Sequence, residues 1–124
     1  MSETADPHPS PTRAPRVADP TREAALQNLA ESLAVLGDDA SRATRSSRDV
    51  RLHIVACQAE HLAGDVRTLI VAWPGDHVVP EPAGYAASTR AARRAYEEPA
   101  LQPLPTGLGA SLRWLLQLAE AAVP

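Results

Sequence analysis

Leucine and alanine recur at steps of three and four residues along most of the chain, which is the spacing of one helix face. The first such segment spans residues 20–36, and its apolar positions are Leu26, Leu29, Leu33 and Leu36. Asp19 is expected to cap this helix, with Pro20 at its first position. Gly37, followed by two aspartates, predicts that the helix ends there and that residues 38–47 form a polar connection.

The second segment, from Arg48 to about Ala72, carries the longest regular pattern. Its apolar positions are Leu52, Val55, Ala59, Leu62, Val66, Leu69 and Trp73. A flank formed by Ala56, Ala63 and Ile70 widens this stripe, as expected for a helix inside a bundle. A proline and a glycine after Trp73 end the segment.

Two shorter segments follow, over residues 85–98 and about 107–122. The first has Tyr85, Ala92 and Tyr96 on one face and ends at Pro99. The second begins after Thr106, which is expected to cap it, and its predicted buried face consists of Leu108, Leu112, Leu115, Leu116 and Ala119. No segment alternates as a strand does. The sequence therefore predicts an all-α fold, an antiparallel four-helix bundle in up-down order.

The first 19 residues differ from the rest. Five of the twelve prolines lie within residues 1–20, and Val17 is the only large aliphatic residue there after Met1. Such a segment has too little apolar surface to offset the entropy lost on ordering. We expect a disordered proline-rich tail at 1–19 and a helical bundle domain at 20–124.

Composition narrows the class of protein. The 124 residues carry a net charge of −3, and all twelve basic residues are arginine. An acidic total argues against nucleic acid or an anionic membrane as the partner. With the abundant alanine and proline, the lack of lysine indicates a GC-rich, bacterial source. One cysteine, no signal peptide and no run of about 20 apolar residues predict a cytoplasmic protein.

One helical stripe carries candidate metal ligands. His53, Cys57 and His61 are spaced i, i+4, with Glu60 beside them, and such pairs can hold a transition metal. One straight helix supplies too few ligands, however, and nothing obvious completes the set. The favoured interpretation is an exposed polar face with an inert thiol, and no cofactor is expected.

Arginines crowd the third segment, where Arg90, Arg93 and Arg94 can form a basic patch. Such a patch can bind phosphates, but the acidic total and the sparse aromatic residues argue against nucleic-acid binding. Solvated surface is the favoured interpretation, and an acidic protein partner is the alternative.

The large aromatic residues are the other candidates for a site. Trp73, Tyr85 and Trp114 can lie inside the bundle and frame a small apolar pocket between alanine-rich positions. Plain core packing is the favoured interpretation of these three side chains.

A set of short matches suggests a family. They are Val50-Arg51-Leu52-His53-Ile54, Glu60, Pro74-Gly75-Asp76, Ala91-Ala92-Arg93-Arg94 and Leu115-Leu116-Gln117-Leu118-Ala119. In order and spacing, over about residues 48–120, the chain resembles small uncharacterised helical proteins of high-GC bacteria labelled as natural product biosynthesis proteins. The resemblance implies a role in specialised metabolism and carries no catalytic residues.

These observations favour a non-enzymatic accessory or regulatory protein that acts through protein–protein interaction, with a protein partner or a second copy of itself. No catalytic motif is present. The alternative is a small-molecule-binding helper or a small helical enzyme that uses a core pocket near Trp73, Tyr85 and Trp114.

Overall fold

The computed structural model describes residues 19–71 and 83–123. They form helices α1 (Pro20–Ala43), α2 (Arg51–Arg67), α3 (Tyr85–Tyr96) and α4 (Thr106–Ala121), with a short 3₁₀ turn, η2 (Pro99–Leu101), before α4. No strand occurs within these two ranges, which confirms the all-α prediction. Residues 1–18 of the tail expected at 1–19, and Trp73, lie outside the described residues.

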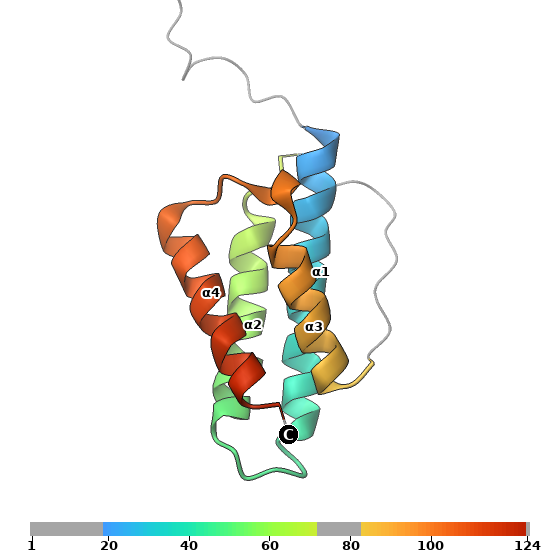
Figure 1. Ribbon diagram of the computed structural model, residues 1–124, viewed down its shortest axis with the longest axis vertical. Helices are drawn as coiled ribbons and strands as arrows, with labels where there is room; N and C mark the ends of the chain where they lie inside the picture. Colours follow the sequence, from blue (N-terminus) through green and yellow to red (C-terminus); the bar gives the residue numbers. More distant parts are fainter. Residues whose placement is uncertain (1–18, 72–82, 124) are drawn as a thin grey trace, which may run out of the picture.

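The four helices lie side by side with α1 as the most extensively packed element. Helix α1 packs against α2 and α3, and α4 packs against the same two helices from the other side. In Figure 1, α1 and α4 run downwards whereas α2 and α3 run upwards, so every packed pair runs in opposite directions. Since α2 and α3 follow each other yet run the same way, the up-down order expected along the chain is wrong at this step.

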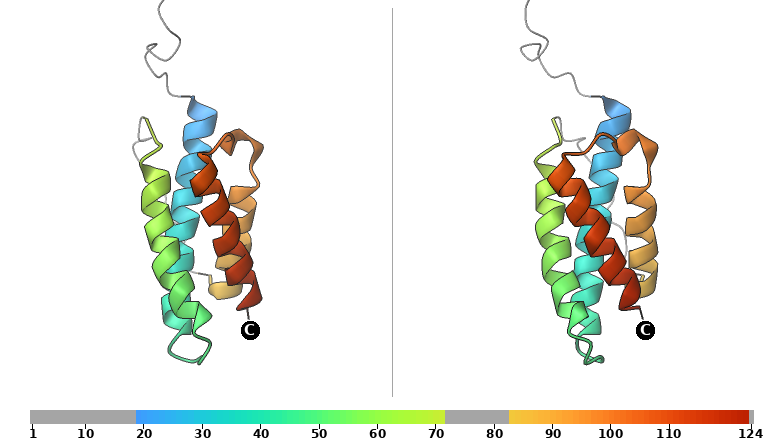
Figure 2. Two further views of the ribbon diagram at one scale, coloured as in Figure 1. Left: turned by 90° about the vertical axis from the view of Figure 1, so that its left-hand side faces the viewer. Right: turned by 60° about the vertical axis from the view of Figure 1, so that its left-hand side comes forward.

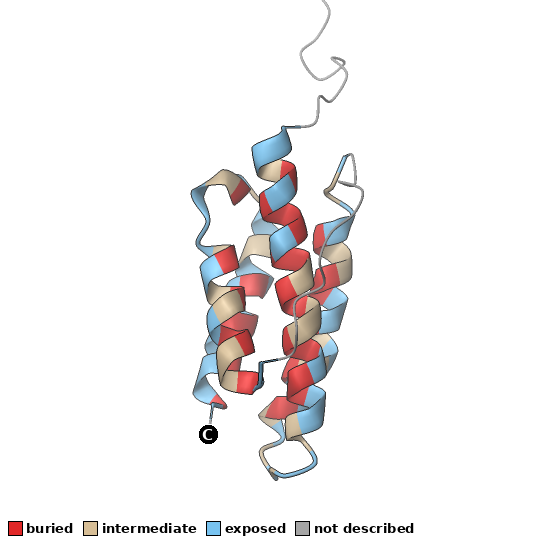
Figure 3. Ribbon diagram, turned by 90° about the vertical axis from the view of Figure 1, so that its right-hand side faces the viewer, coloured by how far each residue is buried: buried red, intermediate tan, exposed pale blue. Residues whose placement is uncertain are grey.

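Leucine supplies most of the large buried side chains. The predicted apolar positions of α1 are all fully buried, namely Leu26, Leu29, Leu33 and Leu36. The α2 positions Leu52, Val55, Ala59, Leu62 and Val66 and the α4 positions Leu112, Leu115, Leu116 and Ala119 are buried as predicted. Buried positions line the inner faces of the helices in Figure 3. Each buried leucine contributes about 1.5–3 kcal/mol to the free energy of unfolding.

Helix α1 does not end at Gly37, which corrects the prediction from sequence. The helix continues to Ala43, and Gly37 is buried against α2. A Cβ added there would lie 3.3 Å from the carbonyl oxygen of Ala56 and 3.6 Å from Cβ of Ala59. The glycine therefore permits a close approach of two helices, and the connection to α2 is shorter than expected.

The helix ends agree only partly with the capping pattern. Asp19 caps α1 as predicted, because its Oδ1 accepts from the backbone N–H of Thr21 at 3.0 Å. Thr106 is instead the first residue of α4, which has no side-chain cap.

Helix α2 is shorter than predicted at both ends. At its start, Asp49 Oδ1 accepts from the backbone N–H of Arg51 at 3.0 Å. Hydrogen bonds from Arg51 hold the pKa of Asp49 below its ordinary value.

Two buried acidic side chains join helices to their neighbours. Glu23 of α1 accepts from the backbone N–H of Val71, after α2, at 2.7 Å. Asp39, near the end of α1, accepts a hydrogen bond from the Ser88 hydroxyl of α3. Asp39 also forms an ion pair with Arg42 at 2.8 Å. These bonds satisfy carboxylates that burial would otherwise destabilise.

Candidate functional site

The structure describes two of the three residues of the expected aromatic pocket, Tyr85 and Trp114. These two residues do not form a pocket together. Tyr85 is buried, and its hydroxyl donates to the carbonyl oxygen of Ala119 in α4 at 2.7 Å. Trp114 is 50% exposed, so the expectation that it lies inside the bundle is wrong. On α4, Trp114 lies about 200° around the helix axis from the buried Leu112, which places it on the outer side.

The burial of Tyr85 gives stability a dependence on alkaline pH. Desolvation raises the pKa of its phenol above 10.0. The native state therefore keeps this proton at a pH where the unfolded chain loses it, and stability falls as pH rises from about 10 through the native pKa. We expect the Tm of the unmodified chain to fall more between pH 9 and 11 than that of Tyr85→Phe, measured by circular dichroism. Parallel pH profiles for the two proteins would contradict this prediction.

The histidine and cysteine stripe lies on the outside of α2. His53, Cys57 and His61 are all exposed, and Nε2 of His61 lies 3.6 Å from Oδ2 of Asp65. In the part of the chain that the structure describes, no three His, Cys, Asp or Glu side chains gather as a metal site requires. These three side chains thus lie on the exposed side of α2.

Several exposed or half-buried apolar residues lie on the α2–α4 pair, the two helices seen side by side in Figure 2. We define the Trp114 face as Val50, the residue before α2, and Ile54 of α2 together with Trp114 and Leu118 of α4. Val50 is 69% exposed and Ile54 is 41% exposed, while Leu118 is half-buried. Each pair is spaced i, i+4, so its members lie one turn apart on the same side of their helix.

Helices α2 and α4 pack against each other in opposite directions. A groove between these helices is lined by Leu62 of α2, by Leu69 just after the end of α2, and by Leu108 and Ser111 of α4. Because the helices run in opposite directions, the next turns of α4 pass beside the earlier turns of α2. The Trp114–Leu118 pair therefore approaches the level of Ile54.

A second surface, which we call the arginine groove, lies between α3 and the end of α4. Its volume is about 400 Å³. Its charged lining residues are Arg90, Arg93, Arg94 and Glu120, and its apolar floor consists of Ala86, Thr89 and Val123. The Thr89 hydroxyl donates within α3, to the carbonyl oxygen of Tyr85 at 2.8 Å. Hence the floor offers mainly carbon atoms to a ligand.

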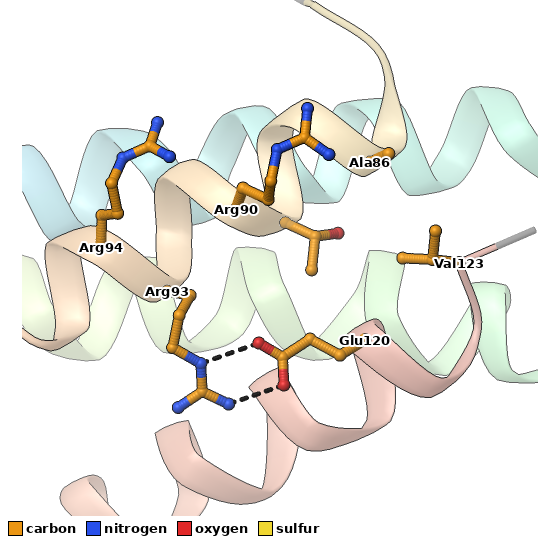
Figure 4. Close-up of a pocket in the computed structure, with 7 residues that line it drawn as sticks. Ala86, Arg90, Arg93, Arg94, Glu120 and Val123 are labelled. Atoms are coloured by element: carbon orange, nitrogen blue, oxygen red, sulfur yellow. Dashed lines mark hydrogen bonds and ion pairs between the residues drawn. The ribbon is translucent and has the colours of Figure 1, made fainter.

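Only one of the three arginines of this groove is paired with an acid in the described residues. Nε and Nη2 of Arg93 donate to the two carboxylate oxygens of Glu120 at 2.8 and 2.7 Å. Figure 4 shows this pair, and it shows the side chains of Arg90 and Arg94 pointing away from Glu120. The hydrogen bonds hold the pKa of Glu120 below its ordinary value and raise that of Arg93. The pair thus stays ionised across the neutral range.

The sequence pattern identified the arginines but not their surroundings. No local spacing relates Glu120 to Arg93, 27 residues earlier. The position of Trp114 opposite the leucine face of α4 was readable from helical periodicity. The prediction that Trp114 lies inside the bundle instead followed the general tendency of large aromatic residues to be buried.

Comparisons of the chain with protein-family models, with curated proteins and with solved structures found no match. No helix within residues 19–71 or 83–123 combines the length and apolar character that spanning a bilayer requires.

Proposed function

We propose that the chain is a non-enzymatic accessory or regulatory protein, an antiparallel four-helix bundle that binds another protein chain through the Trp114 face. The observation that carries the proposal is the half-exposed indole of Trp114. Tryptophan combines a large apolar area with a hydrogen-bond donor and is enriched among the residues that dominate binding energy. The lone cysteine fits a reducing compartment such as the cytoplasm, where we place this activity.

The neighbours of Trp114 strengthen the proposal. Val50 and Ile54 are also exposed and Leu118 is half-buried, so a partner covering this side of the two helices would remove further apolar area from water. A single exposed apolar residue needs no explanation, whereas several on one side of a protein favour an interaction site. The resemblance noted from sequence would place the partner in a specialised-metabolite pathway.

The test is whether a partner depends on Trp114. Proteins retained by the immobilised chain from a lysate of the source organism are identified, purified and titrated by calorimetry. Trp114→Asp is expected to weaken binding of the true partner about 30-fold, as for a central interface residue. Sedimentation equilibrium of the chain alone shows whether the partner is a second copy.

The matched control is Asn28→Asp, which introduces the same aspartate side chain on the exposed side of α1. Helix α1 lies diagonally across the bundle from α4, so this variant is expected to bind like the unmodified chain. A chain that stays monomeric and has no partner sensitive to Trp114→Asp would overturn the proposal.

A further inference from the structure

The arginine groove has a surplus of positive charge that the protein does not neutralise. Arg90 and Arg94 are exposed, and neither forms an ion pair within residues 19–71 and 83–123. They lie i, i+4 on α3, where like charges repel each other and mildly destabilise the helix. An anion between the two side chains would relieve this repulsion.

The nearby acids do not remove this surplus. Both carboxylate oxygens of Glu120 accept hydrogen bonds from Arg93. The negative charge of Glu97 also raises the pKa of Arg93. Arg93 is thereby fixed as one wall of the groove. The guanidinium groups of Arg90 and Arg94 keep their donors for a ligand, and guanidinium donors match the geometry of carboxylate and phosphate oxygens.

The floor of the groove indicates what should be attached to the anion. Ala86, Thr89 and Val123 present mainly methyl groups, in a volume of about 400 Å³. That volume lies within the range of about 300–1,000 Å³ that is usual for small-molecule sites. A strongly hydrated inorganic ion would leave this apolar area uncovered.

We propose that the arginine groove binds a small molecule that carries an oxyanion group, a carboxylate or a phosphate ester, on an apolar body. Arg90 and Arg94 bind the oxyanion, and the body lies along Ala86, Thr89 and Val123. This inference goes beyond the proposed function, because the groove is on the α3 side of α4 and the Trp114 face is on the α2 side.

The experiment is a calorimetric titration of the full chain, in a buffer free of phosphate, with hexyl phosphate, hexanoate, hexanol and inorganic phosphate. One of the two hexyl anions is expected to bind at least about tenfold more tightly than inorganic phosphate, since two buried methylene groups suffice for that factor. The tighter anion identifies the head group. Hexanol is expected to bind weakly, because it lacks the charge.

The double variant Arg90→Gln/Arg94→Gln is expected to lose at least about tenfold in affinity for the tighter anion. Both residues are exposed and glutamine is a good helix former, so the fold should be kept, which circular dichroism checks. Arg67→Gln, the same change at an exposed position of α2, is the matched control and should not alter binding. Trp114→Asp should also bind like the unmodified chain, which separates this proposal from the previous one.

Two results would overturn the inference. One is that neither hexyl anion binds saturably up to about 10 mM. The other is that Arg90→Gln/Arg94→Gln and Arg67→Gln bind the anions alike, since binding would then come from the overall charge of the surface.

Discussion

Gly37→Leu is expected to lower the free energy of unfolding by about 3 kcal/mol, the upper end of the usual cost of overpacking a tight interior. Even a Cβ at this position would lie 3.3 Å from the carbonyl oxygen of Ala56. The remaining leucine atoms would meet the backbone of α2, which cannot move aside as a flexible side chain can. Urea unfolding followed by circular dichroism measures the effect, and the Tm should fall by roughly 12–24 °C.

Gly64→Leu is the matched control, because Gly64 lies within α2 and a Cβ there meets nothing within 4 Å. Leucine favours a helix over glycine by up to about 1 kcal/mol, so this variant should be as stable as the unmodified chain or more stable. The stability of Gly37→Ala should fall between those of the two leucine variants. Alanine favours the helix over glycine, but its Cβ makes a tight contact with α2. Equal stability of the two leucine variants would show that α1 and α2 do not depend on close contact at Gly37.

Asp39→Ala is expected to lower the free energy of unfolding by about 2–3 kcal/mol, the range for losing a hydrogen bond to a charged group in a buried place. The Asp39 side chain is 3% exposed, and the buried Ser88 hydroxyl donates to it. After the change, this hydroxyl of α3 has no acceptor in α1. Arg42 contributes less to the loss, because it is 50% exposed and stays hydrated.

Asp38→Ala is the control for Asp39→Ala. Both residues lie near the C-terminal end of α1, so each removes a similar unfavourable interaction with the helix dipole. Asp38 is exposed, and its replacement should change the stability by less than about 0.5 kcal/mol. A double-mutant cycle with Ser88→Ala measures the coupling across α1 and α3. Equal losses for the two aspartate variants would contradict the structural role of Asp39.

The interiors of the helices were predictable, because a repeat of apolar residues reports directly which side is removed from water. The ends of the helices and the roles of Gly37 and Asp39 were less predictable. Glycine both stops helices and allows them to approach, and local sequence does not separate these roles at Gly37. Asp39 lies three residues after Leu36 on the apolar side of α1, and its hydrogen-bond donor, Ser88, is 49 residues away. Only the tertiary arrangement supplies such a partner.

The two surfaces differ in how much of each could be predicted. The arginines of α3 were visible as a cluster, yet the pairing of Arg93 with Glu120 decides which of them are available to a ligand. The Trp114 face combines residues of two helices, and its existence depends on the register of α2 against α4. The direction of α3 relative to α2 likewise depends on packing with α1 and α4, which no periodicity records.

The chain has a single thiol, that of Cys57, and its position on the exposed side of α2 allows a reagent to label the protein at this one site. A maleimide reagent reacts with this one thiol, and because the sequence has no lysine, no ε-amino group competes for the reagent. Cys57 lies one helical turn from Ile54, beside the Trp114 face. A polarity-sensitive fluorophore attached there would therefore report directly, as a change in emission, when another chain displaces water from that surface.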